Sequence, residues 1–393
     1  MLRKSMVSLA ASVGLAALSA EPATAQGTLN GQAPIVIAHR GASGIRPEHT
    51  IEAYTKAIEL GADFIEPDLV MTKDGHLIAR HDNILDFSTN VRDVAMTDPE
   101  IAALKTTKSI DGGAPFEGYF SEDFTLTQIQ KLKATERRVG EPPVPFRPAN
   151  AAYDNLYDIP TLQQVIDLAK AQNVGIYPET KHPTHFANNG LDMNQTLVNV
   201  LHANYSNAAD EPVFIQSFEI ENLKQLDTMT NLPLVQLFWL PDTKAFDVEQ
   251  AGGTLTYGDM ATPQGLAEIA TYADGVGPEK YSYIIPLDAN NHLTVPTSFV
   301  ADAHNANLLV HPFTFRAENR SLPDEFRIGV DPLALGDSFG EMQAFFATGI
   351  DGFFSDQTDI GRAAVDAFVP EPAGAALLAI GGLAAVQARR RRA

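Results

Sequence analysis

The sequence predicts an α/β fold, a TIM (β/α)8 barrel with an inserted subdomain after the third strand. Short apolar segments alternate with helical segments from about residue 34 to residue 369, and residues 83–155 interrupt this alternation. Repeated β-α units imply a parallel sheet. Polar residues also follow several of the apolar segments, which is where a parallel barrel gathers its functional side chains.

Nine segments have the apolar character of buried strands: 35–38, 64–66, 77–79, 175–177, 212–216, 234–238, 273–276, 308–311 and 352–354. A TIM barrel has eight strands, so one of the nine is expected to be extra. Lys73-Asp74-Gly75 looks like a tight turn rather than a helical crossover. The strand candidates on either side of it, 64–66 and 77–79, therefore fit the β-α repeat least well. Helical periodicity covers Thr50 to Leu60, Thr161 to Ala171 and Glu219 to Met229.

The segment from about Asn83 to Asn155 has no clear strand-helix repeat. It contains Gly112-Gly113, Pro142-Pro143, Pro145 and Pro148. A structureless loop of this length is uncommon in a compact domain. We therefore expect an inserted subdomain on the face that carries the active site.

The composition limits the kinds of ligand. Asp and Glu number 49 against 28 Lys and Arg, which gives a formal net charge of -21. Such an acidic protein repels nucleic acid, and a site for any other anion must gather its positive charge locally. The chain has no cysteine, so disulfides, thiolate metal ligands and a Cys nucleophile are excluded.

Residues 1–25 have the pattern of a secretory signal peptide. Arg3 and Lys4 precede an apolar run from Met6 to Ala20, and Ala23-Thr24-Ala25 is a small-x-small cleavage pattern. The alternative is a membrane anchor, but the apolar run is too short to span a bilayer comfortably. We therefore expect a secreted protein.

Residues 369–393 resemble the PEP-CTERM sorting tail of Gram-negative bacteria. Val369-Pro370-Glu371-Pro372 is followed by an apolar stretch from Ala373 to Val386 and by basic residues from Arg389 to Arg392. The resemblance implies transient membrane association, with the basic cluster on the cytoplasmic side, and a periplasmic or cell-surface location. An ordinary amphipathic tail is the alternative. The barrel domain is expected over residues 34–368.

Three acidic residues at strand ends suggest a metal site. Glu66 and Asp68 are two apart on a strand, so their side chains share one side of it. Glu179 follows the strand at Gly175. Three carboxylates without a thiolate suit a hard cation such as Ca2+ or Mg2+, although paired surface acids are the alternative.

Histidines and cations follow the same strands. His39 and His81 each end an apolar segment, and such a pair could serve as general base and general acid at a phosphorus atom. Arg40 can grip phosphate oxygens in bidentate fashion, and Lys181 supplies a point charge. A lone histidine after a strand is usually structural, but two of them beside an acidic metal site favour a catalytic role. Arg40 or Lys181 alone would more often be a surface charge.

Several runs resemble the signature of the glycerophosphodiester phosphodiesterase family. These are HRGASG at 39–44, PEHT at 47–50, EPDLVMTKDG at 66–75, HD at 81–82 and PETK at 178–181. Three further runs resemble the periplasmic bacterial branch in particular, namely YADGVGP at 272–278, HPFTFR at 311–316 and DGFFSD at 351–356. The resemblance extends from about Pro34 to Ala364.

The resemblance implies a TIM barrel with an insertion after the His-Asp motif. It also implies a phosphoric diester hydrolase that converts small glycerophosphodiesters to sn-glycerol 3-phosphate and an alcohol. His39 and His81 would be the acid-base pair, and Arg40 and Lys181 would contact the phosphate. The divalent metal, Ca2+ in the periplasmic branch with Mg2+ as the alternative, would be held by Glu66, Asp68 and Glu179. Pro67 between the two acids departs from the family pattern, in which other residues are usual at this position. Because proline lacks an N–H, we expect no ladder hydrogen bond to be donated there.

Other functions compete with this one. A phospholipase D-like or lysophospholipase D-like enzyme would use the same chemistry on lipid head groups. Paired carboxylates on a barrel also suit a glycosidase, but the two histidines, Arg40 and Lys181 argue against it. A non-catalytic surface protein is disfavoured by the complete polar set. The alcohol of the substrate, the oligomeric state and the choice between attack by a neighbouring hydroxyl and attack by water are left open.

Overall fold

The structure is a computed structural model that describes residues 27–140 and 142–368. The predicted signal peptide and the predicted sorting tail lie outside these residues. Within the described ranges, no helix combines the length and apolar character that crossing a membrane requires.

Eight strand positions form a closed parallel barrel. Two of the positions are each built from two short strands. In ring order the positions are β1 (Ile35–His39), β2 with β3 (Phe64–Glu66, Asp68–Met71), β9 with β10 (Gly175–Ile176, Glu179–Thr180), β11 (Ile215–Ser217), β12 (Leu234–Phe238), β13 (Gly275–Pro278), β14 (Leu309–Val310) and β15 (Gly352–Ser355).

The ring closes between β14 and β15. The backbone N–H of Asp351 donates to the carbonyl of Val310 at 2.9 Å, and that of Phe354 donates to the carbonyl of Pro312 at 3.1 Å. The predicted TIM barrel is therefore confirmed.

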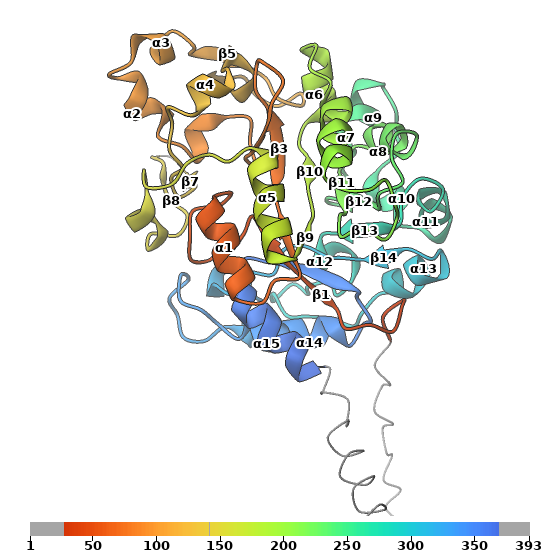
Figure 1. The fold of residues 1–393 in the computed structure, drawn as a ribbon. Helices are drawn as coiled ribbons and strands as arrows, with labels where there is room; N and C mark the ends of the chain where they lie inside the picture. The colour runs from red at the N-terminus through yellow and green to blue at the C-terminus, as the bar shows by residue number, and fades with distance from the viewer. Residues whose placement is uncertain (1–26, 141, 369–393) are drawn as a thin grey trace, which may run out of the picture.

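One long helix follows each strand position and packs outside the barrel (Figure 1). These helices are α1 (Ile51–Glu59), α5 (Leu162–Gln172), α7 (Met193–Asn204), α8 (Ile220–Asp227), α11 (Pro263–Ile269), α13 (Phe299–Asn305), α14 (Ser338–Phe346) and α15 (Thr358–Phe368). Thr161 caps α5 in a reciprocal capping box with Gln164, as a Thr before an apolar helical run predicts. Shorter helices lie in the loops: α6 (Pro183–Asn188), α9 (Phe246–Gln250), α10 (Tyr257–Met260), α12 (Lys280–Tyr283), η4 (Asn319–Ser321) and η5 (Asp324–Phe326).

Two apolar layers stabilise the barrel. Alternate residues of a barrel strand point inward and outward, and β1 contributes residues to both layers. Ile37 packs with Tyr177, Val235 and Phe354 inside the barrel. Val36 belongs instead to the larger layer between strands and helices. The barrel interior is thus filled with side chains, and only its rim is free to form a site.

The segment 77–79 is the extra strand candidate. It forms β4 (Leu77–Ala79), which pairs antiparallel with β3 in the register Leu69–Ala79 and Met71–Leu77. Gly75 has a φ of 80° at the connecting turn, as expected from Lys73-Asp74-Gly75. The hairpin therefore extends above the barrel and contributes no strand position to it.

Pro67 separates β2 from β3. Proline lacks the N–H that would continue the ladder, while its carbonyl accepts a hydrogen bond from the N–H of Glu179 at 3.0 Å. Strand pairing resumes at Asp68, which lies opposite Glu179 in the parallel register. The departure from the family pattern therefore divides the strand without displacing either neighbouring acid from the barrel wall.

The insertion follows β4, between the second and third strand positions of the barrel. It is built from short elements: η1 (Leu85–Phe87), α2 (Val91–Ala95), α3 (Pro99–Ala102), β5 (Thr106–Lys108), β6 (Phe116–Gly118), η2 (Ser121–Asp123), α4 (Leu126–Ile129), β7 (Arg138–Val139), β8 (Val144–Pro145) and η3 (Asn150–Tyr153). Figure 1 shows these elements beside β3, above α1. Leu85, Val91 and Ile101 are fully buried members of the main apolar layer, so the insertion packs onto the barrel rather than standing apart from it.

Candidate active site

A cavity of about 320 Å³ opens at the carboxyl ends of the barrel strands. Its lining includes six of the seven predicted site residues: His39, Arg40, Glu66, His81, Glu179 and Lys181. The seventh, Asp68, lies in a carboxylate cluster with Glu66 and Glu179. The structure thus brings all seven residues together, while their chemical roles stay predictions.

The carboxylates of Glu66, Asp68 and Glu179 face one another. One oxygen of each lies within 4.8 Å of the other two, and all three residues are buried. Burial and repulsion from Asp68 raise the pKa of Glu66 well above its ordinary value. Burial likewise raises the pKa of Glu179, to about 8, despite the opposing effect of Lys181. Burial would also raise the pKa of Asp68, but Lys181 and Arg40 hold it well below the usual range.

This cluster fits a hard divalent cation. It offers carboxylate oxygens and no thiolate, the ligand set that Ca2+ and Mg2+ prefer. Gln216 adds a further observation, because its Nε2 donates to Glu66 at 3.3 Å while its buried Oε1 has no hydrogen-bond partner among the described residues. A buried acceptor without a donor is costly, and a nearby cation would remove that cost.

Arg40 occupies a left-handed backbone conformation, with a φ of 61°. Non-glycine residues rarely adopt this region, and they often do so at functional sites. The conformation lets its N–H donate to Glu66 at 2.7 Å. Its guanidinium lies 3.0 Å from Glu48 through Nη1 and 3.2 Å from Asp68 through Nε. Arg40 is therefore held at the cavity by three acids from three positions in the chain.

Lys181 also contacts the carboxylate cluster. Its Nζ is 2.7 Å from Glu179 and 4.0 Å from Asp68. Arg316 also lines the cavity. Arg40, Lys181 and Arg316 thus place cationic groups at this cavity in a protein of strongly negative net charge, as binding of an anion requires.

His39 is the last residue of β1, and Asp356 orients its ring. Nδ1 of His39 lies 2.6 Å from Oδ1 of Asp356, the residue after β15. With the Nδ1 proton donated to the carboxylate, Nε2 is the nitrogen available to a ligand. Burial and the charge of Arg40 lower the pKa of His39 to about 4, so the ring is neutral near pH 7.

His81 reaches the cavity by another route. The prediction that it ends a barrel strand is wrong, because it follows the antiparallel strand β4. The hairpin instead returns the chain to the barrel rim, where the N–H of Arg80 donates to the carbonyl of Asp68 at 2.9 Å. Nδ1 of His81 lies 3.1 Å from Oδ1 of Asp82. Burial, Arg40 and Lys181 lower the pKa of His81 to about 3.

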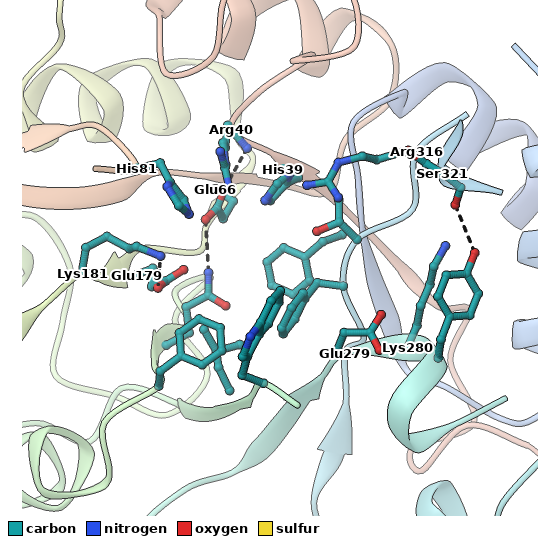
Figure 2. Close-up of a pocket in the computed structure, with 18 residues that line it drawn as sticks. His39, Arg40, Glu66, His81, Glu179, Lys181, Glu279, Lys280, Arg316 and Ser321 are labelled. Atoms are coloured by element: carbon teal, nitrogen blue, oxygen red, sulfur yellow. Dashed lines mark hydrogen bonds and ion pairs between the residues drawn. The ribbon is translucent and has the colours of Figure 1, made fainter. Parts of the chain in front are cut away.

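Figure 2 shows how these side chains share the cavity. His81 and Lys181 lie on one side of Glu66, and His39 and Arg316 lie on the other. The two imidazoles therefore lie on opposite sides of Glu66 in this view, next to the carboxylate cluster. A ligand bound beside the cluster could contact both rings.

Several residues that contribute to this site were not predicted as site residues from the sequence. Glu48 and His49 lie in the run PEHT, and Asp356 ends the run DGFFSD, so these two motifs carried a signal without a stated role. Arg137 and Arg147, which also line the rim, come from the irregular insertion and had no such signal. His311, the first residue of the run HPFTFR, lies inside the barrel with its Nδ1 2.8 Å from the hydroxyl of Tyr177.

The fold and the site together define a TIM-barrel enzyme whose cavity combines a buried carboxylate cluster, two Asp-paired imidazoles and an Arg-Lys pair. Comparison with known families adds that residues 39–360 match the glycerophosphoryl diester phosphodiesterase family. The chain belongs to this family, which confirms the resemblance predicted from the sequence.

Individual relatives agree with this assignment. The chain is 36% identical over 340 residues to a glycerophosphodiester phosphodiesterase of Arabidopsis thaliana, covering 83% of this chain and 84% of the relative. It is 32% identical over 338 residues to a glycerophosphodiester phosphodiesterase of Haemophilus influenzae, covering 81% and 88%. An Oleispira antarctica phosphodiesterase, solved in complex with the product sn-glycerol-3-phosphate, shares the fold with a TM-score of 0.52 and 18% identity, covering 86% of this chain and 99% of that one.

Proposed function

We propose that this protein hydrolyses glycerophosphodiesters to sn-glycerol 3-phosphate and an alcohol. One observation carries the proposal: a single cavity holds two Asp-paired imidazoles next to a buried carboxylate cluster. Family membership supports it, because the two curated relatives described above are named for this activity. The assignment to the periplasmic bacterial branch is a finer part of the same proposal.

Arg40 and Lys181 would contact the phosphate. A phosphodiester carries one negative charge, and more charge develops on its oxygens in the transition state. Both cations are held in place before substrate binds, Arg40 by Glu48 and Lys181 by Glu179. Little side-chain entropy would then be lost when the phosphate enters.

Glu66, Asp68 and Glu179 would hold one divalent cation, for which we propose Ca2+ with Mg2+ as the alternative. When bound, the ion would act as a Lewis acid and neutralise charge on the phosphoryl oxygens. The chain's contribution is the desolvated acids, kept close together despite the repulsion that raises the pKa of Glu66.

His39 and His81 would transfer the protons. Both rings are neutral in the free protein, since burial lowers their pKa values to about 4 and about 3. An anionic phosphodiester between them raises both pKa values, so that one ring can carry a proton. One ring would then accept the proton of the attacking hydroxyl, and the other would donate a proton to the departing alcohol oxygen.

The attacking oxygen can come from either of two sources. The neighbouring glycerol hydroxyl could form a new P–O bond while the bond to the alcohol breaks, giving a cyclic glycerol phosphate that water then opens. Water could instead attack phosphorus directly. We propose the first route, because a tethered nucleophile has a large effective concentration.

Product analysis tests the proposed function. The purified protein is incubated with glycerophosphocholine, glycerophosphoethanolamine and lysophosphatidylcholine, and phosphorus NMR follows the products. We expect sn-glycerol 3-phosphate from the first two substrates. Turnover of the lysolipid alone would favour the lysophospholipase D-like alternative, and no turnover of any substrate, with Ca2+ or Mg2+ supplied, would contradict the proposal.

We further propose that the protein is exported and acts in the periplasm or at the cell surface. The support is the sequence pattern of residues 1–25 and 369–393. Mass spectrometry of exported protein should show a chain that begins near Gln26 and ends near Val369. An exported chain that keeps Arg389 to Arg392 would contradict processing of the tail.

A further inference from the structure

We propose that Arg137 and Arg147 are positioning residues, supplied by the insertion, that orient the two imidazoles through Asp82 and Asp356. The inference rests on the proposed function, in which His39 and His81 transfer protons. It gives the insertion a role in acid-base catalysis, beyond covering the barrel.

Arg147 secures the partner of His39. Its Nη2 lies 2.5 Å from Oδ2 of Asp356, while the other oxygen of the same carboxylate, Oδ1, lies 2.6 Å from Nδ1 of His39. Arg147 also pairs with Glu318, and its Nη1 donates to the carbonyl of Ser43 at 3.1 Å. The side chain of Arg147 is 10% exposed and that of Asp356 is 2% exposed, so this contact is shielded from water.

Asp356 has a second cationic neighbour. Nε of Arg316 lies 3.0 Å from the same Oδ2, but the Arg316 side chain is 32% exposed. Burial alone would raise the pKa of Asp356, yet Arg147 and then Arg316 hold it well below the usual range. The better buried Arg147 is therefore the stronger of the two contacts.

Arg137 lies beside the partner of His81, although the contacts on this side are ion pairs without the geometry of hydrogen bonds. Its Nη2 lies 2.7 Å from Oδ2 of Asp82, whose Oδ1 lies 3.1 Å from Nδ1 of His81. The same Nη2 lies 2.6 Å from Glu48, which in turn contacts Arg40. Arg137 thus connects a proton-transferring ring to the arginine proposed to bind phosphate.

One hairpin supplies both guanidinium groups. Arg137 immediately precedes β7, and Arg147 follows β8 by two residues. The two strands pair antiparallel, and beyond their last pair the N–H of Phe146 donates to the carbonyl of Arg137 at 2.7 Å. The pairing that forms the hairpin therefore places both arginines at the rim together.

The arrangement has a physical consequence for catalysis. A carboxylate that accepts from a histidine with one oxygen can still rotate, and binding its other oxygen to an arginine stops that rotation. A fixed carboxylate holds the ring in one tautomer with Nε2 directed at the ligand. Loss of such outer contacts typically costs ten- to a hundredfold in activity.

Direct binding of substrate by the two arginines is the competing role, since both line a cavity of about 290 Å³ next to His39 and His81. Kinetics of Arg137→Gln and Arg147→Gln separate the roles. Positioning predicts that kcat falls about ten- to a hundredfold while KM changes little, and that Lys substitutions restore part of kcat. Arg138→Gln is the matched control, because Arg138 lies in β7 of the same hairpin and pairs with Asp154 away from both histidines.

Activity on a second substrate separates orientation of the imidazoles from a purely structural role of the two arginines. In sn-glycero-3-phospho-p-nitrophenol the leaving group departs without a proton, so the ring that protonates the alcohol is no longer needed. One of the two Gln variants should therefore lose much less activity on this substrate than on glycerophosphocholine. Equal losses on both substrates in both variants, or a raised KM with unchanged kcat, would overturn the proposal.

Nitrogen-15 NMR of labelled histidines gives an independent result that needs no turnover. We expect Arg147→Gln to mix the tautomers of His39, Arg137→Gln to mix those of His81, and Arg138→Gln to alter neither ring. Unchanged rings in both variants would overturn the inference even if the wild-type protein is fully active. If the wild-type protein hydrolyses neither substrate, the proposed function fails, while the NMR result still decides whether the arginines orient the rings.

Discussion

Nε2 of His49 lies 2.9 Å from Oδ2 of Asp68, and Nδ1 of the same ring lies 2.8 Å from the hydroxyl of Tyr54. The His49 side chain is fully buried, and its backbone has a φ of 55°. Burial lowers the pKa of His49 although Asp68 acts to raise it. A neutral imidazole therefore orients one carboxylate of the proposed metal site without adding charge.

Replacing His49 with Phe should weaken cation binding. Phe keeps most of the ring volume but cannot donate to Asp68, and outer contacts of this kind are typically worth about ten- to a hundredfold in metal affinity. Calorimetric titration with Ca2+ or Mg2+ alone measures the change. His76→Phe is the control, because the His76 side chain is 51% exposed at the turn of the hairpin. Equal cation affinity in His49→Phe and wild type would show that His49 does not support cation binding through Asp68.

Replacing His39 or His81 with Gln should lower kcat by about a hundred- to ten-thousandfold. The reason is that each variant lacks one proton-transferring group, while Arg40 and Lys181 still bind phosphate, so KM should change little. Steady-state kinetics on glycerophosphocholine measure both constants. His292→Gln serves as the control, since that side chain is 49% exposed and pairs with Glu325 away from the cavity. A variant at either position with wild-type kcat would exclude that ring from catalysis.

The proposed cyclic route can be tested with a substrate analogue. Removing the glycerol hydroxyl next to the phosphate removes the tethered nucleophile, so the analogue should bind normally but turn over far more slowly. The loss should appear in kcat, because the missing group acts only in the transition state. Equal kcat for the analogue and glycerophosphocholine would leave direct attack by water as the mechanism.

Glu136 should make the stability of the protein depend on pH. It lies in the insertion and is 3% exposed, and burial raises its pKa from 4.5 to about 8 despite the opposing charge of Arg147. Between these two values the unfolded chain loses the proton and the folded chain keeps it. The folded state therefore loses stability as pH rises through this window, by at most about 1.4 kcal/mol per pH unit.

Glu136→Gln removes this dependence. The variant should match wild type near pH 5 and exceed it in free energy of unfolding near pH 8. Urea denaturation at the two pH values measures the difference, and Glu117→Gln, at an exposed side chain of the same insertion, should show no such trend. A constant difference between Glu136→Gln and wild type across the window would show that Glu136 ionises normally in the folded protein.

The site residues that could be predicted from the sequence share one property, which is their position in or directly after a barrel strand. His39, Glu66 and Glu179 lie within β1, β2 and β10, and Lys181 directly follows β10. A parallel barrel brings such positions to one rim, so their meeting could be predicted without any knowledge of distances. Leu77–Ala79 was predicted as a barrel strand but forms a hairpin strand. Three apolar residues have the same pattern in either setting, so the sequence could not distinguish the two.

The contacts that orient His39 could not be predicted, because its partner and the arginine beside that partner are distant in the chain. Asp356 lies 317 positions from His39 and 209 from Arg147. No local pattern joins residues so far apart, and the hairpin of β7 and β8 has no hydrophobic period strong enough to fix its place over the barrel. The sequence therefore predicted the groups proposed to react, whereas their orienting contacts required the structure.

Turnover as a function of divalent cation tests whether this protein is a metal-dependent phosphodiesterase. The protein is dialysed against chelator, and release of sn-glycerol 3-phosphate from glycerophosphocholine is measured while Ca2+ or Mg2+ is added back. We predict negligible turnover without cation, saturable recovery with cation, and an affinity at least about a hundredfold weaker in Glu179→Gln, with Glu279→Gln, another acid of the same cavity, behaving like wild type. Full turnover in excess chelator would show that catalysis needs no cation at the carboxylate cluster.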